Sequence, residues 1–144
     1  MKIAITGHTK GIGKCIKDLL EKDGHEVVGA STSTGINVMR PKSVISWIEK
    51  ENPDVFVNNV YAPNSQCNIL YQLYEKWQYE DKLIINMSST SGEAHTHFQQ
   101  MGYNKDWTPY VSDKARLNFA SLYLSERFNE HHRCRVTNVS PGFV

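Results

Sequence analysis

The sequence predicts an α/β protein built on a doubly wound parallel sheet of about six strands. Two observations lead to this fold class. Short apolar runs typical of strands alternate with amphipathic helical patterns over the whole length. The first apolar run, Ile3–Ile5, leads into a glycine-rich turn at Gly7–Gly13 that opens a helix, as in a β-α-β unit whose strands lie parallel. The 144 residues suit one domain, 1–144.

Each element follows from a local pattern. Apolar and β-branched runs predict strands at 3–5, 26–30, 54–58, 83–87 and 135–139, with a short stub at 36–38. Apolar residues at helical spacing predict helices at 14–22, 41–50, 67–79 and 110–128. The segment Ser31–Gly35 is too short for a crossover helix, so the helix expected between the second and third strands is absent. The last strand, 135–139, is expected at the edge of the sheet unless a partner covers it.

Composition and charge narrow the function classes. Lysine and arginine number 16 against 15 acidic residues, without charge blocks, so neither nucleic acid nor an anionic membrane is indicated as a partner. No apolar run approaches the ~18 residues of a membrane span, and the first residues predict a strand rather than a signal peptide. Three scattered cysteines are typical of a reduced protein, so we expect a cytoplasmic location.

Histidines occur close together at two places, His95 with His97 and His131 with His132. No cysteine or carboxylate cluster joins either pair at the spacing that metal ligands require. The sequence therefore predicts no metal site.

Four segments fall at the carboxyl ends of the predicted strands, where doubly wound sheets bind their ligands. These segments are Gly7–Gly13, Asn58–Tyr61, Ser88–Ser89 and Ser140–Val144. Residues without a Cβ let a phosphate approach the first turn, and the first amides of the following helix are free to hold an anion. An ordinary glycine-rich turn is the alternative. Tyr110 and Lys114 are four residues apart on one predicted helix, so they share a face.

Five motifs occur in order along the chain: T-G-H-T-K-G-I-G (Thr6–Gly13), N-N-V-Y (Asn58–Tyr61), N-M-S-S (Asn86–Ser89), Y-V-S-D-K (Tyr110–Lys114) and N-V-S-P-G-F-V (Asn138–Val144). Each is weak alone, but five in this order are specific. On these motifs the chain resembles the short-chain dehydrogenase/reductase family, whose members have a Rossmann-like fold. The resemblance covers the whole chain.

The resemblance implies hydride transfer between a nicotinamide cofactor and a carbonyl or alcohol carbon. Tyr110 would be the general acid or base, although a free tyrosine has a pKa of ~10. Lys114 would stabilise the phenolate and bind the nicotinamide ribose, and Ser89 would position the substrate oxygen. Asn68 is the candidate for the asparagine that holds a relay water in some members, with a capping or turn role as the alternative.

The resemblance also implies the residues that bind the cofactor. These are Gly7, Thr9, Lys10, Gly11, Ile12, Gly13, Ser31, Thr32, Asn37, Val38, Asn59, Val60, Tyr61, Tyr110, Lys114, Pro141, Gly142 and Val144. After the second strand, Ala30–Ser33 offers hydroxyls and no acid that would bind the ribose hydroxyl of NAD. Lys10 resembles the basic residue of NADP-preferring members. We therefore expect NADP(H) rather than NAD(H).

Some features depart from the family pattern. Tyr61 stands where glycine is usual and could crowd the cofactor. The loop between Ser89 and Tyr110 is long, and the chain ends at Val144, before the substrate loop and seventh strand that the family carries. Two interpretations follow: a small reductase whose long, aromatic-rich loop replaces the missing lid, or a non-catalytic nucleotide-binding or assembly module. The resemblance also implies a homodimer or higher homo-oligomer, with a subunit contact through helices 67–79 and 110–128.

Overall fold

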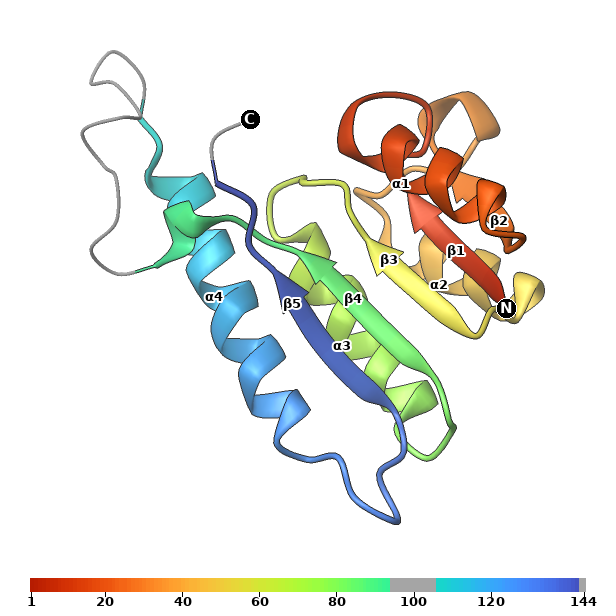
Figure 1. Cartoon of the computed structure of the whole chain (residues 1–144). Coiled ribbons are helices and arrows are strands. Elements are labelled where there is room, and N and C mark those ends of the chain that lie inside the picture. The colour runs from red at the N-terminus through yellow and green to blue at the C-terminus, as the bar shows by residue number, and fades with distance from the viewer. Residues whose placement is uncertain (94–105, 143–144) are drawn as a thin grey trace.

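A computed structural model of the chain describes residues 1–93 and 106–142. The elements follow one another as β1 (Lys2–Thr6), α1 (Gly11–Lys22), β2 (Glu26–Ala30), η1 (Thr32–Thr34), α2 (Pro41–Glu51), β3 (Val55–Asn58), α3 (Ser65–Trp77), β4 (Leu83–Met87), η2 (Thr90–Gly92), α4 (Thr108–Ser125) and β5 (Arg135–Val139). The two η elements are single 3₁₀ turns. The strict alternation of strand and helix that the apolar runs indicated is confirmed (Figure 1).

The strands form one parallel sheet in the order β2-β1-β3-β4-β5. The chain moves outward from β1 to β2, then returns to the other side of β1 and continues outward to β5. The direction of winding therefore reverses between β1 and β3, which is the switch point where doubly wound sheets bind ligands. The predicted fold class is confirmed. As expected for the last strand, β5 lies at an edge of the described sheet.

The predicted strand at 36–38 is not a strand, and the described sheet has five strands rather than six. After β2, Ser31 and Thr34 close η1 with reciprocal capping hydrogen bonds, and Gly35 turns the backbone into the left-handed region at φ +79°. The amide oxygen of Asn37 then accepts from the Met39 amide and tightens a second turn. These turns lead directly into α2. Only the single turn η1 lies between β2 and residues 36–38, as expected, and α2 is the helix that connects β2 to β3.

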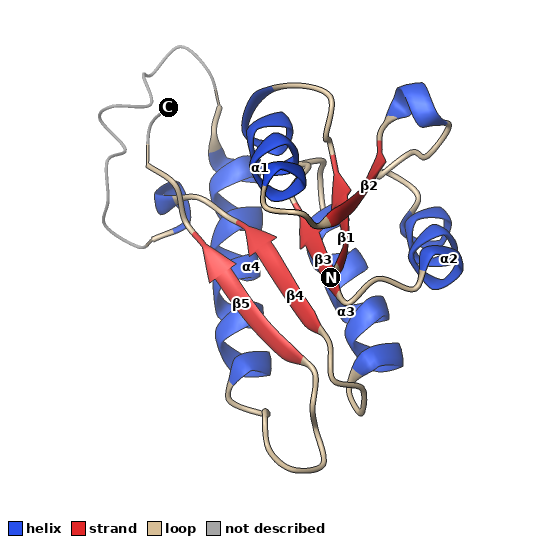
Figure 2. Cartoon of the chain, turned by 45° about the vertical axis from the view of Figure 1, so that its right-hand side comes forward, coloured by secondary structure: helices blue, strands red, loops and turns tan. Residues whose placement is uncertain are grey.

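The two faces of the sheet are covered unequally (Figure 2). Helices α2, α3 and α4 pack on one face around Phe56 and Ile84, which are fully buried. On the other face, Ile16 and Leu20 of α1 pack beside β1 and β2. An apolar hollow of about 380 Å³ lies on this second face between α1 and the strands β3 to β5. Within the described ranges, no helix is long and apolar enough to cross a bilayer.

Candidate cofactor and active site

The glycine-rich turn after β1 requires two of its glycines for close packing. Gly7 has φ +73°, and a Cβ there would lie 2.3 Å from Cγ2 of Val60. A Cβ on Gly13 would lie 2.1 Å from the carbonyl oxygen of Gly7 and 2.7 Å from Nδ2 of Asn59. Because no side chain fits in these spaces, the turn can lie directly against the loop that follows β3.

Thr6 joins the turn to that loop. Its hydroxyl oxygen accepts from the amides of Asn59 and Val60 at 3.0 and 3.2 Å. The Asn59 side-chain amide also donates to the Thr6 carbonyl at 3.0 Å. The carboxyl ends of β1 and β3 are therefore held together by side chains as well as by the sheet.

A cavity of about 320 Å³ opens at this switch point. It is lined by Gly7, Thr9, Lys10, Ala30, Ser31, Thr32, Ile36, Val38, Asn59 and Val60. Eight of these ten were predicted as cofactor residues. Ala30 and Ile36 were not, and an apolar residue at a strand end or in a turn gives no chemical signal that could have identified them. Among the described residues that line the cavity, none is acidic and Lys10 is the only cation.

The first turn of α1 begins directly after Lys10, which lines the cavity, and no N-cap side chain takes up its backbone donors. Lys10 occupies the N-cap position without a side-chain hydrogen bond, and no acidic residue lies in the first turn. The amides of Gly11, Ile12 and Gly13 therefore retain the partial positive charge of a helix N-terminus. This arrangement suits an anionic group such as a pyrophosphate.

The predicted pair Tyr110 and Lys114 lies on α4, and the two side chains face each other. The Lys114 Nζ lies 5.6 Å from the centroid of the Tyr110 ring. Lys114 is only 3% exposed. Its ammonium donates to Oε1 of Gln66 at 2.8 Å and to the carbonyl of Met87 at 2.9 Å. Burial lowers the pKa of Lys114 to about 8, against the opposing attraction of Asp113.

Tyr61 lies over this pair. Its ring meets the Tyr110 ring edge-on with centroids 4.8 Å apart, and the Lys114 Nζ is 5.4 Å from its centroid. The Tyr61 hydroxyl donates to Asp113 at 3.4 Å, and burial raises the pKa of Tyr61. Beside it, the space bounded by Tyr61, Gln66 and Asp113 is only about 10 Å³. The bulky ring expected at this position therefore packs directly against Tyr110 and Lys114.

Ser89 is placed by η2, which packs against α4. The Ser89 hydroxyl oxygen accepts from the Ser91 amide at 3.1 Å, which leaves its own proton free to donate. Ser88 is 6% exposed and donates instead to the Lys114 carbonyl at 3.4 Å. A Cβ on Gly92 would lie 2.6 Å from the Lys114 carbonyl carbon, so glycine permits this close contact. Gly92 was not singled out from the sequence.

Asn68 lies away from this cluster. Its amide oxygen accepts from Arg116 at 3.4 Å, and Arg116 also donates to Asn64 at 3.0 Å. The α3 side chain that reaches Lys114 belongs to Gln66, two residues earlier. The structure therefore gives the Asn68 side chain a surface contact between α3 and α4, within the helix rather than at its cap or in a turn, and brings Gln66 to the lysine.

Among the remaining predicted residues that the structure describes, Asn37, Pro141 and Gly142 do not line the cavity. Asn37 is exposed and its side chain closes its own turn. The Pro141 carbonyl accepts from the Thr90 amide at 3.3 Å, so Pro141 and Gly142 follow β5 past η2. Val144, the histidines His95 and His97, and most of the long loop before Tyr110 lie outside the described residues. In the described segments no group of three or more metal-ligating side chains occurs.

Comparison with solved structures identifies the fold. A GDP-L-fucose synthetase from Naegleria fowleri bound to NADP superposes with a TM-score of 0.72 at 18% identity, covering 98% of this chain and 49% of that chain. Serine dehydrogenase from Escherichia coli matches with a TM-score of 0.70 at 17% identity, covering 99% and 82%. The 3-alpha-hydroxysteroid dehydrogenase from Pseudomonas sp. B-0831, complexed with NADH, matches with a TM-score of 0.71 at 17% identity, covering 99% and 72%.

These likenesses define the class of fold: the chain has the Rossmann-like fold of short-chain dehydrogenases/reductases. The resemblance expected from the five motifs is confirmed at this level. The chain spans about half the length of the synthetase. No protein-family model matches the chain, and a search of curated proteins finds no match.

Proposed function

We propose that this chain is an NADP(H)-dependent oxidoreductase that transfers a hydride between nicotinamide and a small carbonyl or alcohol substrate. The main support for the proposal is that the residues predicted to bind the cofactor and to catalyse the reaction lie close together in the fold. Eight predicted cofactor residues line one cavity at the switch point. The loop Asn59–Tyr61 connects that cavity to Tyr110 and Lys114. Bound NADP and NADH in two structures of the same fold support the cofactor class.

The residues present fit such a cofactor at its adenosine and pyrophosphate end. The cavity volume lies in the range of small-molecule sites. Gly7 and Gly13 leave no side chain between the turn and a ligand, and the amides of Gly11 and Ile12 would hold the pyrophosphate. Ser31 and Lys10 would face the adenosine ribose, and a bound nicotinamide would supply or accept the hydride.

In the proposed reduction, Tyr110, Lys114 and Ser89 each have a separate role. Tyr110 donates its phenolic proton to the substrate carbonyl oxygen as the carbon is reduced. The Lys114 ammonium, 5.6 Å from the Tyr110 ring, stabilises the phenolate that remains. Ser89 donates its free hydroxyl proton to the same substrate oxygen, because its own oxygen is already an acceptor for Ser91. In the oxidation, Tyr110 takes the proton back.

The substitution Tyr110→Phe tests this proposal. It removes the proton donor and keeps the ring that contacts Tyr61. We expect wild-type protein to oxidise NADPH in the presence of a panel of small aldehydes and ketones, and the variant to lose at least ~100-fold in rate. Equal rates for the two proteins would remove the catalytic role of Tyr110 and with it the enzyme proposal.

The preference for NADP(H) rests on Lys10 in the cavity wall and on the absence of an acid among the described lining residues. A ribose phosphate is attracted by the lysine, and no carboxylate opposes it. Dissociation constants for NADPH and NADH, measured by fluorescence titration, decide the matter. Lys10→Ala should weaken NADPH binding and leave NADH binding nearly unchanged, and tighter binding of NADH by wild type would reverse the assignment.

A second candidate function is a nucleotide-binding or assembly module without turnover. One observation favours it: the Tyr61 ring, at a position where the family pattern has glycine, packs on the Tyr110 ring and lies over the Lys114 ammonium. A protein that binds NADPH and adenosine phosphates equally well, with no activity on any carbonyl, would support this alternative.

We also propose a cytoplasmic homodimer. The three cysteines carry free thiols, which suits a reducing compartment. Large apolar side chains of α3 and α4 remain exposed, among them Tyr71 and Phe119, which suits a subunit contact.

A further inference from the structure

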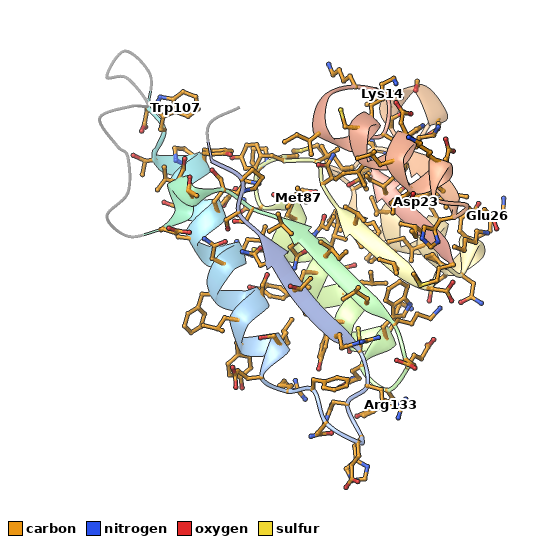
Figure 3. All side chains as sticks on the ribbon, in the orientation of Figure 1. Lys14, Asp23, Glu26, Met87, Trp107 and Arg133 are labelled. Atoms are coloured by element: carbon orange, nitrogen blue, oxygen red, sulfur yellow. The ribbon has the colours of Figure 1, made fainter. Side chains whose placement is uncertain are left out.

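Gln66 lies in the first turn of α3 and is 4% exposed. Its Nε2 donates to the carbonyls of Asn58 and Met87, both at 2.9 Å. Its Oε1 accepts from the Lys114 ammonium at 2.8 Å. One side chain thus connects the ends of β3 and β4 to α4, near the point that Met87 marks in Figure 3.

The orientation of the Gln66 amide is set by its partners. Turning the amide over would place Oε1 against two carbonyl oxygens and the NH₂ group against an ammonium, so every contact would become repulsive. The backbone is fixed as well, since the Gln66 carbonyl accepts from Asn58 Nδ2 at 2.9 Å. Asn58 donates in turn to Asn86, and Asn86 to Ser121, all within the interior.

We propose that Gln66 is a positioning residue that holds the Lys114 ammonium for its part in the proposed reaction. Gln66 and the Met87 carbonyl take two of the three N–H donors of Lys114. This fixes Nζ beneath the rings of Tyr61 and Tyr110, at 5.4 and 5.6 Å from their centroids. The third N–H donor would then be available to a ligand. The inference rests on the proposed function for its purpose, but the contact itself can be tested without turnover.

The choice of glutamine has an electrostatic consequence. An amide oxygen stabilises the ammonium by a hydrogen bond without cancelling its charge, so the full positive charge acts on Tyr110. The other titratable groups facing Lys114 are Asp113, which favours the charged form, Cys67 of α3, and the two tyrosines. Removing the Gln66 acceptor leaves a buried cation with one fewer partner, which lowers its proton affinity further.

The first experiment uses the wild-type protein alone, labelled with ¹⁵N and ¹³C for NMR. We expect the side-chain amide resonances of Gln66 to move during a pH titration with the same midpoint as the Lys114 Cε resonance, because Oε1 accepts from that ammonium. The side-chain amide of Gln78, which donates to the Glu75 carbonyl at the end of the same helix, is the control and should not follow Lys114. A Gln66 amide without an inflection at the Lys114 midpoint overturns the proposal.

The second experiment uses Gln66→Met, which keeps the length of the side chain and removes its polar atoms. The measured pKa of Lys114 should fall by about 1 or more, whereas Gln78→Met should leave it unchanged. An unchanged pKa in folded Gln66→Met would contradict the assignment. Should that variant not fold, the wild-type titration decides alone.

Kinetics separate this inference from the proposed function. With an active wild type, Gln66→Met should lower kcat several-fold and move the alkaline limit of the rate to lower pH, with little change in the dissociation constant of NADPH. A protein inactive on every substrate, whose Gln66 and Lys114 nevertheless titrate together, would refute the reductase proposal and leave the Gln66 contact standing.

Discussion

Among single residues, Lys114 carries the largest electrostatic cost of the candidate site. It is 3% exposed, and its pKa falls from the usual 10.5 to about 8 because burial disfavours the charge. That difference corresponds to about 3 kcal/mol. The folded chain therefore keeps this cation at neutral pH at the expense of stability, which is consistent with the catalytic role proposed for Lys114.

The pH dependence of stability follows from this pKa. Between about 8 and 10.5 the unfolded chain binds a proton at Lys114 that the folded chain has lost, so the free energy of unfolding gains a contribution that rises with pH through this window. Below it both states are charged and the cost is fully present. In Lys114→Met this rise should be missing, as measured by urea unfolding at pH 7.5 and 10. Lys76→Met, at a half-exposed surface position, is the control. Identical pH dependence in wild type and Lys114→Met would show that Lys114 is not the source.

Tyr61 is the second residue for which we make a prediction, because its ring lies where it would affect the binding of NADPH. Its ring packs against Tyr110 and Lys114 and takes up space beside the two side chains that a bound cofactor would contact in the proposed reaction. Tyr61→Ala should bind NADPH several-fold more tightly than wild type in a fluorescence titration. Tyr61→Phe keeps the ring, loses only the hydrogen bond to Asp113 and should stay near wild type. Weaker binding by the alanine variant would mean that the ring supports the cofactor instead of crowding it.

At this scale the sequence predicts some contacts and not others. Tyr110 and Lys114 face each other because they are four residues apart on one helix, which spacing alone indicates. Gln66 and Lys114 are 48 positions apart and meet only after α3 docks on α4. The helix predicted at 67–79 left Gln66 in a loop and Asn68 near the helix start. Residues that are two positions apart on a helix point in nearly opposite directions. Because α3 starts at Ser65, both Gln66 and Asn68 lie on the helix, and only the Gln66 side-chain amide faces the lysine.

Among the elements, the strands were the most predictable because their apolar runs are short and bounded. The bounds of β2, β4 and β5 agree with the predicted ranges, β1 is longer by one residue at each end, and β3 starts one residue later. The stretch 36–38 has the same local composition as a strand and is not one. There, the turn at Gly35 and the hydrogen bond from Met39 to Asn37 direct the chain into α2 before it can pair. The composition of residues 36–38 does not show whether they pair as a strand or form the turns that lead into α2.

The turn between β1 and α1 gives a prediction for an element. Gly13→Ala places a Cβ 2.1 Å from the Gly7 carbonyl oxygen, so the turn must move away from Asn59. We expect a loss of about 2–4 kcal/mol in the free energy of unfolding, with NADPH binding abolished. Gly11→Ala meets no atom within 4 Å and should cost only about 1 kcal/mol, from its φ of +58°. Urea unfolding compares the two, and equal losses would argue against close packing of the turn.

For the molecule as a whole, the exposed apolar surface of α3 and α4 indicates where a subunit contact could form. Helices α3 and α4 bury one side against the sheet, yet Phe119, Leu122 and Tyr123 of α4 are 73%, 61% and 62% exposed. Arg116 joins the two helices at their outer side, donating to Asn64 and lying 5.7 Å over the ring of Tyr71. Exposed aromatic and apolar side chains beside an arginine are typical of the centre of a protein interface.

The last prediction therefore concerns the homodimer. Phe119→Asp places a charge at the most exposed aromatic position of α4, and burying that charge in a subunit contact would cost at least about 2 kcal/mol. Wild type should sediment as a dimer at micromolar concentration, and the variant should dissociate at concentrations about 30-fold higher or remain monomeric. Phe128→Asp changes an equally apolar residue that is 50% exposed but lies beyond the end of α4, and should leave the mass unchanged. A wild type that is monomeric at all concentrations, or a Phe119→Asp variant that dimerises as well as wild type, would exclude this face as the subunit contact.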